Sequence, residues 1–364
     1  MTKKKNILIC PLEWGLGHAA RMIPVARRLS AMNHNVIVAA GDAHLALFKA
    51  EIPGLKYIKF KGFSPGYSKY FPQYLAMLFK TPVLLYYIIS DHLLLKKLVA
   101  EYNIDIVISD NRFGLWNRKV KCVYVTHMPR IPLPSSLKML EIIGVLLHRF
   151  IIKKYALCLI PDLPGELNLS GRLSHGLRLP SNVMYSGIMS RFFEEDSPGD
   201  LHFSYPHKTV ILSGPEPQRS ILQMKLAEYF RYRKPVTVIL EGKPQAGDQP
   251  EKKDNLVFYG HLSTPLFGEL VKSSSLVISR SGYTTIMDLV FLESTALLIP
   301  TPGQTEQEYL AEYLTGKGWF SMLKQKDLGL IKGITPGSAI PKMIKTESAA
   351  LFENALNELL KEDE

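Results

Sequence analysis

Residues 6–32, NILICPLEWGLGHAARMIPVARRLSAM, decide the fold class because they join a strand, a glycine turn and a helix. The apolar run NILIC lacks polar alternation, which is typical of a parallel strand buried on both faces. A helix is expected from about 20 to 32, and the run NVIVAA at 35–40 predicts the next strand. Strand, helix and strand in this order indicate an α/β fold.

The same order continues along the chain and restarts after one interruption. The stretch at 189–208 is polar, rich in turn formers and without periodicity, so it predicts a linker. We therefore expect two doubly wound domains that face each other across a cleft, over 1–190 and 207–345, and a last amphipathic helix within 346–364. Further strands are expected at 55–60, 104–110, 122–127, 156–162, 209–214, 236–242, 255–260, 276–282 and 296–303.

The chain of 364 residues has a formal charge of +11, which favours an acidic partner such as a phosphate ligand, a nucleic acid or an anionic membrane. Residues 112–180 alone hold eleven Lys or Arg and three acids. A solvated basic face would explain them equally well. Nucleic acid is not expected as a partner, because this stretch lacks an aromatic-lined or recognition-helix pattern.

The three cysteines, Cys10, Cys122 and Cys158, stand in apolar runs without metal-ligand spacing. We expect buried thiols in a reducing compartment and no metal site. The N-terminus lacks the features of a signal peptide, and the longest uncharged part of the most apolar region, 81–90, is too short to span a bilayer. A cytoplasmic location is expected.

Two apolar stretches, 74–98 and 135–154, raise the question of a membrane surface. The second also carries Lys138, Arg149 and Lys153, so both stretches are candidates for peripheral docking on an anionic membrane. Helices buried inside the domain would look equally apolar, and this alternative stays open.

Candidate catalytic groups follow the first strands, since ligands of such sheets bind beyond the carboxyl ends of the strands. Gly15 and Gly17 permit close backbone approach, and they place His18 at the junction between loop and helix. Asp110 ends a strand and is expected to orient an imidazole so that its other nitrogen acts as a base. A structural histidine at residue 18, and an Asx-turn at Asp110, are the alternatives. His127 is a third candidate, ranked below His18.

Two turns in the second half combine a strand end, a small residue and a helix start, which suits a diphosphate. Asp288, one turn into the helix, is expected to accept bonds from ribose hydroxyls, although a surface acid would look the same. The expected phosphate contacts are Ser213, Gly214, Arg219, Arg280, Ser281, Gly282 and Thr284.

A cluster of donors and acceptors precedes the next helix. It comprises Gln304, Glu306, Gln307 and Glu308, and it suits a polyhydroxylated ligand such as a sugar or, equally, a solvated helix start. At the N-terminal helix, Pro24 lacks an N–H donor and is expected in the first turn.

Three segments in this order resemble the glycosyltransferase family 28 group. They are GLGH at 15–18, RSGYTTIMD at 280–288 and PTPGQTEQEYLAEYL at 300–314. The resemblance implies the GT-B fold, in which two Rossmann-like domains bind the acceptor in the first domain and the nucleotide sugar chiefly in the second. It further implies a metal-independent, inverting transfer.

The resemblance also assigns roles. It makes His18 the base, puts Gly260 and His261 beside uracil, Asp288 on the ribose, and Gln307 and Glu308 on the donor sugar. Gly17 is counted among the nucleotide-sugar contacts, and the helix at 347–361 is expected to cross back to the first domain.

We therefore expect a hexosyltransferase that moves a sugar from a UDP-sugar to a lipid-linked or glycan acceptor of the cell envelope. UDP-sugar is the donor substrate, and no cofactor is expected. The alternatives are a nucleotide-sugar hydrolase or 2-epimerase on the same fold, and a non-catalytic subunit that recruits a partner enzyme to membranes.

Overall fold

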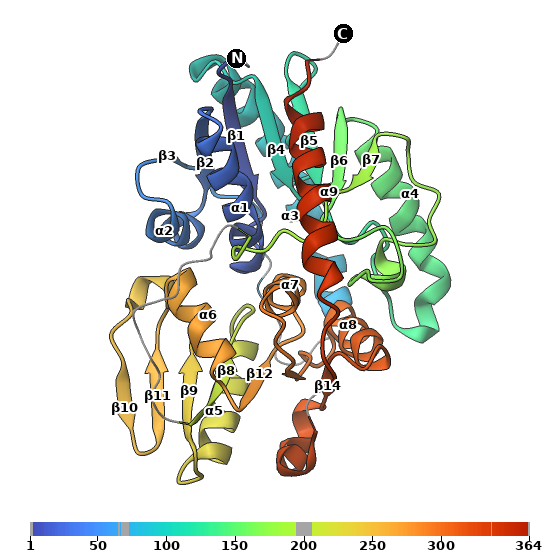
Figure 1. The fold of residues 1–364 in the computed structure, drawn as a ribbon. Helices are drawn as coiled ribbons and strands as arrows, with labels where there is room; N and C mark the ends of the chain where they lie inside the picture. The colour runs from blue at the N-terminus through green and yellow to red at the C-terminus, as the bar shows by residue number, and fades with distance from the viewer. Residues whose placement is uncertain (1–2, 65, 67–72, 194–205, 336, 363–364) are drawn as a thin grey trace.

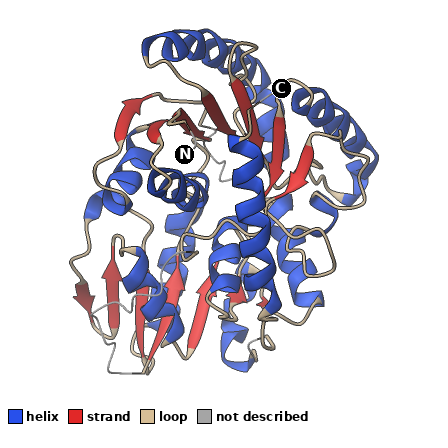
Figure 2. Cartoon of the chain, turned by 45° about the horizontal axis from the view of Figure 1, so that its top comes forward, coloured by secondary structure: helices blue, strands red, loops and turns tan. Residues whose placement is uncertain are grey.

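The alternation of strands and helices builds two separate sheets in the computed structural model of the protein, which describes residues 3–64, 66, 73–193, 206–335 and 337–362. Figure 1 shows the two sheets one above the other, and Figure 2 shows helices on both sides of each. Two doubly wound domains confirm the expected fold class. Part of the expected linker, 194–205, lies outside the described residues.

The N-terminal sheet has seven strands in the order β3-β2-β1-β4-β5-β6-β7, and every neighbouring pair is parallel. Strands β2 and β3 follow β1 on one side of it, and β4 to β7 follow in order on the other side, as in Rossmann-type sheets. Their bounds are β1 Asn6–Pro11, β2 Asn35–Ala40, β3 Lys56–Lys59, β4 Ile106–Asp110, β5 Lys121–Val125, β6 Leu157–Ile160 and β7 Val183–Tyr185.

The C-terminal sheet repeats this plan in the order β10-β11-β9-β8-β12-β13-β14, and only the edge strand β10 is antiparallel. The strands β7, β10 and β14 were not expected from the sequence, because each has only two or three residues. The bounds are β8 His207–Ile211, β9 Val236–Leu240, β10 Glu251–Lys253, β11 Leu256–Tyr259, β12 Leu276–Ser279, β13 Leu297–Leu298 and β14 Ser321–Met322.

Helices cover both faces of each sheet. Alternate residues of β1 enter different cores: Ile7 and Ile9 pack on one face, Leu8 and Cys10 on the other. All three cysteines are buried and free. The α-helices are α1 Gly17–Ala31, α2 Asp42–Glu51, α3 Gln73–Glu101, α4 Glu141–Ile152, α5 Gln218–Phe230, α6 Thr264–Lys272, α7 Tyr283–Phe291, α8 Thr305–Gly316 and α9 Met343–Leu360, and the 3-10 helices are η1 Ser135–Leu140, η2 Gly171–Leu173, η3 Pro244–Ala246 and η4 Gln325–Gly333.

Helix α1 corrects one expectation. It begins at Gly17, so Pro24 lies inside the helix and not in its first turn. A proline in this position costs about 3 kcal/mol. The helix continues because Ile23 and Val25, on either side of Pro24, are buried in the core beneath β1. Tertiary packing here outweighs the local preference.

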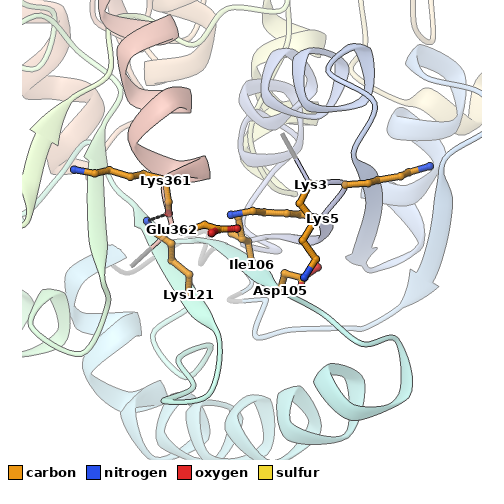
Figure 3. A pocket seen from close by; sticks show the side chains of 8 residues that line it. Lys3, Lys5, Asp105, Ile106, Lys121, Lys361 and Glu362 are labelled. Atoms are coloured by element: carbon orange, nitrogen blue, oxygen red, sulfur yellow. Dashed lines mark hydrogen bonds between the residues drawn. The ribbon is translucent and has the colours of Figure 1, made fainter. Parts of the chain in front are cut away.

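Helix α9 follows the C-terminal domain in the chain but packs on the N-terminal one. It begins at Met343, a few residues before the expected boundary, and buries Phe352 and Leu356 in the core shared with α1 and α2. Lysines of the N-terminal domain hold its far end (Figure 3): Lys5 Nζ donates to Leu360 O at 2.7 Å, and Lys121 Nζ donates to Lys361 O at 2.8 Å. Cations suit the carbonyl end of a helix.

The two connections between the domains lie against each other. Gly187, with φ of +68°, packs so closely on α9 that a Cβ would lie 2.5 Å from Ser348 O. Beyond it, the Phe193 ring lies 4.6 Å from that of Phe352 in α9 and 5.6 Å from that of Phe291 in α7. The chain thus leaves and re-enters the N-terminal domain at one place.

We expect Phe352→Ala to lower the free energy of unfolding by about 3–5 kcal/mol, since it removes a buried ring that joins α9 to the first domain. Equilibrium urea unfolding measures the change. The matched control, Asn354→Ala, alters an exposed position of the same helix and is expected to change stability by less than about 0.5 kcal/mol. Equal midpoints for the two variants would contradict the assigned packing of α9.

Candidate active site

The carboxyl ends of β1 and β4 bring the first candidates together. Pro11 of β1 lies opposite Asp110 of β4 in the register, so the turn after β1 lies beside the Asp110 carboxylate. His18 Nδ1 is 3.0 Å from Asp110 Oδ2. The Asx-turn alternative does not describe this carboxylate, because its hydrogen bonds go to α1 and not to Asn111.

Arg21 completes this cluster and was missed in the sequence. Its Nε donates to Asp110 Oδ2 at 2.9 Å, and its Nη2 donates to Asp110 Oδ1. Residues three apart on a helix lie on one face, so Arg21 shares that of His18. The signal was overlooked because the helix was expected to begin at about residue 20.

Charge and burial set the protonation of this pair. Burial alone would raise the pKa of Asp110, but the Arg21 guanidinium and His18 lower it to about 2. Burial lowers the pKa of His18, and the Asp110 carboxylate opposes that effect. Arg21 Nη2 also lies 2.9 Å from His18 Nδ1, and both Nη2 and Nδ1 point to the same carboxylate. In the neutral tautomer with its proton on Nδ1, His18 donates to the ionised Asp110, which leaves Nε2 as the atom able to take a proton.

A second histidine links this cluster to the opposite domain. His127, which follows β5, lies 2.9 Å from Arg21 Nη1 through Nδ1 and 2.8 Å from Glu306 Oε1 of α8 through Nε2. Its ring stacks on Tyr283 of α7, with centroids 4.2 Å apart and planes inclined by 11°. His127 thus joins both walls of the cleft.

His44 and Glu13 hold the turn that carries His18. Gly15 has φ of +84°, a conformation suited to glycine. His44 Nε2 lies 3.0 Å from Gly15 O, and His44 Nδ1 lies 3.0 Å from Glu13 Oε1. Hydrogen bonds and the charge of Glu13 raise the pKa of His44 against the effect of its burial. A charged His44 can donate to both neighbours at once.

The start of α7 meets the start of α1. Thr284 Oγ1 donates to Gly17 O at 3.0 Å, and a Cβ on Gly17 would lie 3.0 Å from that hydroxyl. A Cβ on Gly282 would lie 3.9 Å from Ser213 Oγ, so the turns after β8 and β12 are neighbours, as one shared ligand requires. Gly214, with φ of +92°, belongs to the first of these turns.

Two side chains of the polar cluster at the start of α8 accept hydrogen bonds from backbone N–H groups of the preceding loop. Gln307 Oε1 accepts from Thr301 N at 2.8 Å, and Glu308 Oε1 accepts from Gly303 N at 2.9 Å. Ser281 Oγ donates to Gln307 O at 2.7 Å, which ties α7 to α8. Gln304 Oε1 is buried without a hydrogen-bond partner among the described residues, so it is an acceptor that remains available.

Two charged candidates point elsewhere. The Arg280 guanidinium is fully buried and donates to Ile299 O, Pro300 O and Gln218 O at 3.0–3.1 Å, so it braces strand ends. Burial lowers its pKa to about 9. The Asp288 carboxylate accepts from Ser190 Oγ at 2.7 Å and from Arg191 Nε at 3.1 Å. It therefore lies at the domain junction.

The remaining candidates belong to the second domain. Arg219 pairs with Glu216 and donates to Gly242 O at 2.9 Å. Gly260 packs beneath η3, where a Cβ would lie 2.6 Å from Ala246 Cβ. His261 Nε2 lies 3.8 Å from Glu51 Oε1 of α2, across the domain boundary. Within the described ranges, no group of three or more His, Cys, Asp or Glu is arranged to hold a metal ion.

Comparison with known proteins identifies part of the chain. Residues 244–362, about a third of its length, match the model of the glycosyltransferase family 28 C-terminal domain. No curated protein matches the chain.

Solved structures match nearly the whole chain. The glycotransferase of kitacinnamycin has 13% identity and a TM-score of 0.60, with 99% of this chain and 100% of that chain covered. The glycosyltransferase SnogD from Streptomyces nogalater has 15% identity and a TM-score of 0.55, with 99% and 100% covered. The spinosyn rhamnosyltransferase SpnG complexed with thymidine diphosphate has 15% identity and a TM-score of 0.55, with 97% and 96% covered.

At these identities the solved structures establish only the fold. The family model matches residues of the second domain. Residues 244–362 are similar to the glycosyltransferase family 28 C-terminal domain, and the chain as a whole has the GT-B fold of these glycosyltransferase structures.

Proposed function

We propose that this glycosyltransferase is an inverting enzyme that moves a hexose from a UDP-sugar to a hydroxyl of a lipid-linked or glycan acceptor of the cell envelope. The observation that carries the proposal is the meeting of two groups at the cleft. The His18–Asp110 pair lies at one wall, and the start of α7 contacts it through Thr284 and Gly17.

The first step is removal of a proton. His18 Nε2 accepts the proton of the acceptor hydroxyl while Nδ1 stays bonded to Asp110. The hydroxyl oxygen then forms a bond to the anomeric carbon from the side opposite the diphosphate. The bond between that carbon and the diphosphate oxygen breaks, and UDP leaves with its electron pair. Attack from the opposite side inverts the anomeric centre.

The second domain is suited to the leaving diphosphate. The turns at Ser213 and Gly282 are neighbours, and the helix that starts at Tyr283 directs free N–H groups toward the space beside them. Gly260 and His261 are proposed to lie beside uracil, and Gln304, Gln307 and Glu308 to hold the donor sugar. Relatives complexed with thymidine diphosphate and with spinosyn aglycone support a nucleotide sugar and an acceptor as the two ligands.

An exposed apolar surface on the first domain supports the choice of a lipid-linked acceptor. Helices α3 and α4 pack on the same face of the first sheet through Leu95 and Ile152, so their outer sides face the same way. Among those outer residues Phe79 is 80% exposed. The exposed apolar side chains are Leu78, Phe79, Val83, Leu85, Tyr86, Ile89, Leu93 and Leu94 of α3, Ile131, Met139 and Leu140, and Ile142, Ile143, Leu146, Leu147 and Phe150 of α4.

This apolar surface begins close in sequence to His127, which contacts the His18 cluster through Arg21. Ile131 is four residues beyond His127, and Pro132 O accepts from Thr305 Oγ1 of α8 at 2.6 Å. Lys138, Lys153 and Lys154 add positive charge at its edge. Among the described residues no helix is both long and apolar enough to cross a bilayer. We therefore propose peripheral docking on an anionic membrane, on its cytoplasmic side.

Replacing His18 with Ala is expected to lower the transfer rate by about 10²–10⁴-fold, because the acceptor hydroxyl loses its base. A thermal-shift screen of nucleotide sugars first identifies the donor, by stabilisation that grows with ligand concentration. The variant is expected to keep this donor-induced shift, and His34→Ala, distant from the cleft, serves as control.

Unchanged turnover in the His18→Ala variant would contradict the assigned base. Release of free sugar without an acceptor would instead indicate a hydrolase, and a changed sugar still attached to the nucleotide would indicate an epimerase.

We propose a junction role for Asp288. Asp288→Asn leaves Arg191 without its charged partner, so the free energy of unfolding is expected to fall by about 3 kcal/mol. UDP affinity, measured by calorimetry, is expected to change less than twofold. Glu312→Gln, at an exposed position of α8, is the control. A large loss of UDP affinity at unchanged stability would favour the ribose role instead.

Flotation with vesicles of anionic phospholipid tests the membrane surface. We expect the wild type to float, and a Leu146→Glu/Phe150→Glu variant to stay in the dense fraction, because two charges replace exposed apolar contacts. The matched control is Met224→Glu/Leu330→Glu, which changes two equally exposed apolar residues of the other domain. Failure of the wild type to float would exclude this mode of docking.

A further inference from the structure

The nitrogens of His127 have fixed roles, because its two neighbours differ in chemistry. A guanidinium only donates, so His127 Nδ1 must accept from Arg21 Nη1, which lies 2.9 Å away. The proton of a neutral His127 is then on Nε2, where it is donated to the Glu306 carboxylate at 2.8 Å. Only one of the two neutral tautomers satisfies both contacts.

Arg21 connects this histidine to the base. Its side chain is 1% exposed, and it reaches Asp110 through two nitrogens. A doubly held carboxylate cannot rotate away, so Oδ2 stays in place to accept from His18 Nδ1. The contacts therefore run from Glu306 through His127 to Arg21, which reaches His18 both through Asp110 and directly, with Nη2 2.9 Å from His18 Nδ1.

We propose that Arg21 and His127 are positioning residues for the transfer reaction, and that Glu306 of the opposite domain locks them in place when the cleft closes. The inference rests on the proposed function, in which His18 is the base. It gives Glu306 a role different from the sugar contact expected from the sequence. The base is then fully assembled only while the two domains are in contact.

Closure also changes the charge around His18. The groups that face it are Arg21 of α1, Asp110 of β4, His127 after β5 and Glu306 of α8, and Tyr283 of α7 stacks on His127. When the domains separate, Glu306 moves away and the positive charge of Arg21 acts on His18 with one carboxylate fewer to oppose it. The Glu306 carboxylate therefore favours the imidazolium form of His18 and opposes the burial that lowers its pKa.

The test uses histidine resonances and needs no substrate. In protein labelled with ¹³C and ¹⁵N at histidine, the ¹⁵N shifts of His127 are expected to report an unprotonated Nδ1 and a protonated Nε2. Variants His18→Gln and His127→Gln assign the two residues among the ten histidines. The opposite tautomer for His127 would overturn the proposal.

Glu306→Gln then removes the charge and keeps an acceptor of the same shape. We expect the midpoint of the His18 titration to fall by about half a pH unit or more, since a carboxylate that favours the imidazolium is lost. Glu312→Gln, an exposed carboxylate on the same helix, is expected to leave this midpoint unchanged. Equal midpoints in wild type and Glu306→Gln would overturn the proposal.

In transfer assays Arg21→Lys keeps the charge but cannot hold Asp110 with two nitrogens. We expect kcat to fall at least tenfold while KM for the donor stays within twofold, because Arg21 is assigned no ligand contact. An unchanged kcat would overturn the positioning role. If His18 shifts in Glu306→Gln but no nucleotide sugar supports transfer by the wild type, the proposed function fails and the coupling across the cleft remains.

Discussion

A carboxylate that is buried at the end of a strand must be compensated, and Asp110 finds its partners on a single turn of α1. Arg21 and His18 both reach it, and the Asp110 side chain has no exposed surface. Removing Arg21 would leave a buried charge without its cationic partner, which costs far more than the intact pair contributes. The position of α1, the orientation of His18 and the link to His127 all follow from this need. The candidate site thus grows from one buried carboxylate.

The sequence predicted the fold well, because its strands are apolar on both faces and its turns hold glycines. The strands β7, β10 and β14 escaped prediction, since their two or three residues carry no recognisable pattern, whereas the equally short β13 belongs to a longer apolar run. Proximity of His18 and Asp110 was also predictable, because parallel strands bring their carboxyl ends to one edge. The direction in which long side chains point was not predictable from the sequence. Arg280 turns to backbone carbonyls, and Asp288 turns to Arg191, because contacts between distant segments decide these orientations.

The same limit explains why Glu306 was read as a sugar contact. In the sequence it belongs to a run of amide and carboxylate side chains, and nothing local distinguishes it from Gln307 or Glu308. In the structure these two satisfy backbone N–H groups of their own loop, whereas Glu306 reaches His127 of the other domain. Contacts between domains are invisible to local patterns, and Glu306 makes one of them.

The close packing of Gly187 on Ser348 has a mechanical consequence. Two connections that touch form a single hinge between the domains, whereas two connections far apart would restrict rotation of one domain against the other. A single hinge favours rotation of the domains over sliding. The displacement of any contact between them therefore grows with its distance from the hinge. Contacts near Phe193 would barely move during such a rotation. The hydrogen bond from Thr264 Oγ1 to Glu51 Oε2, at 2.7 Å, would break or re-form.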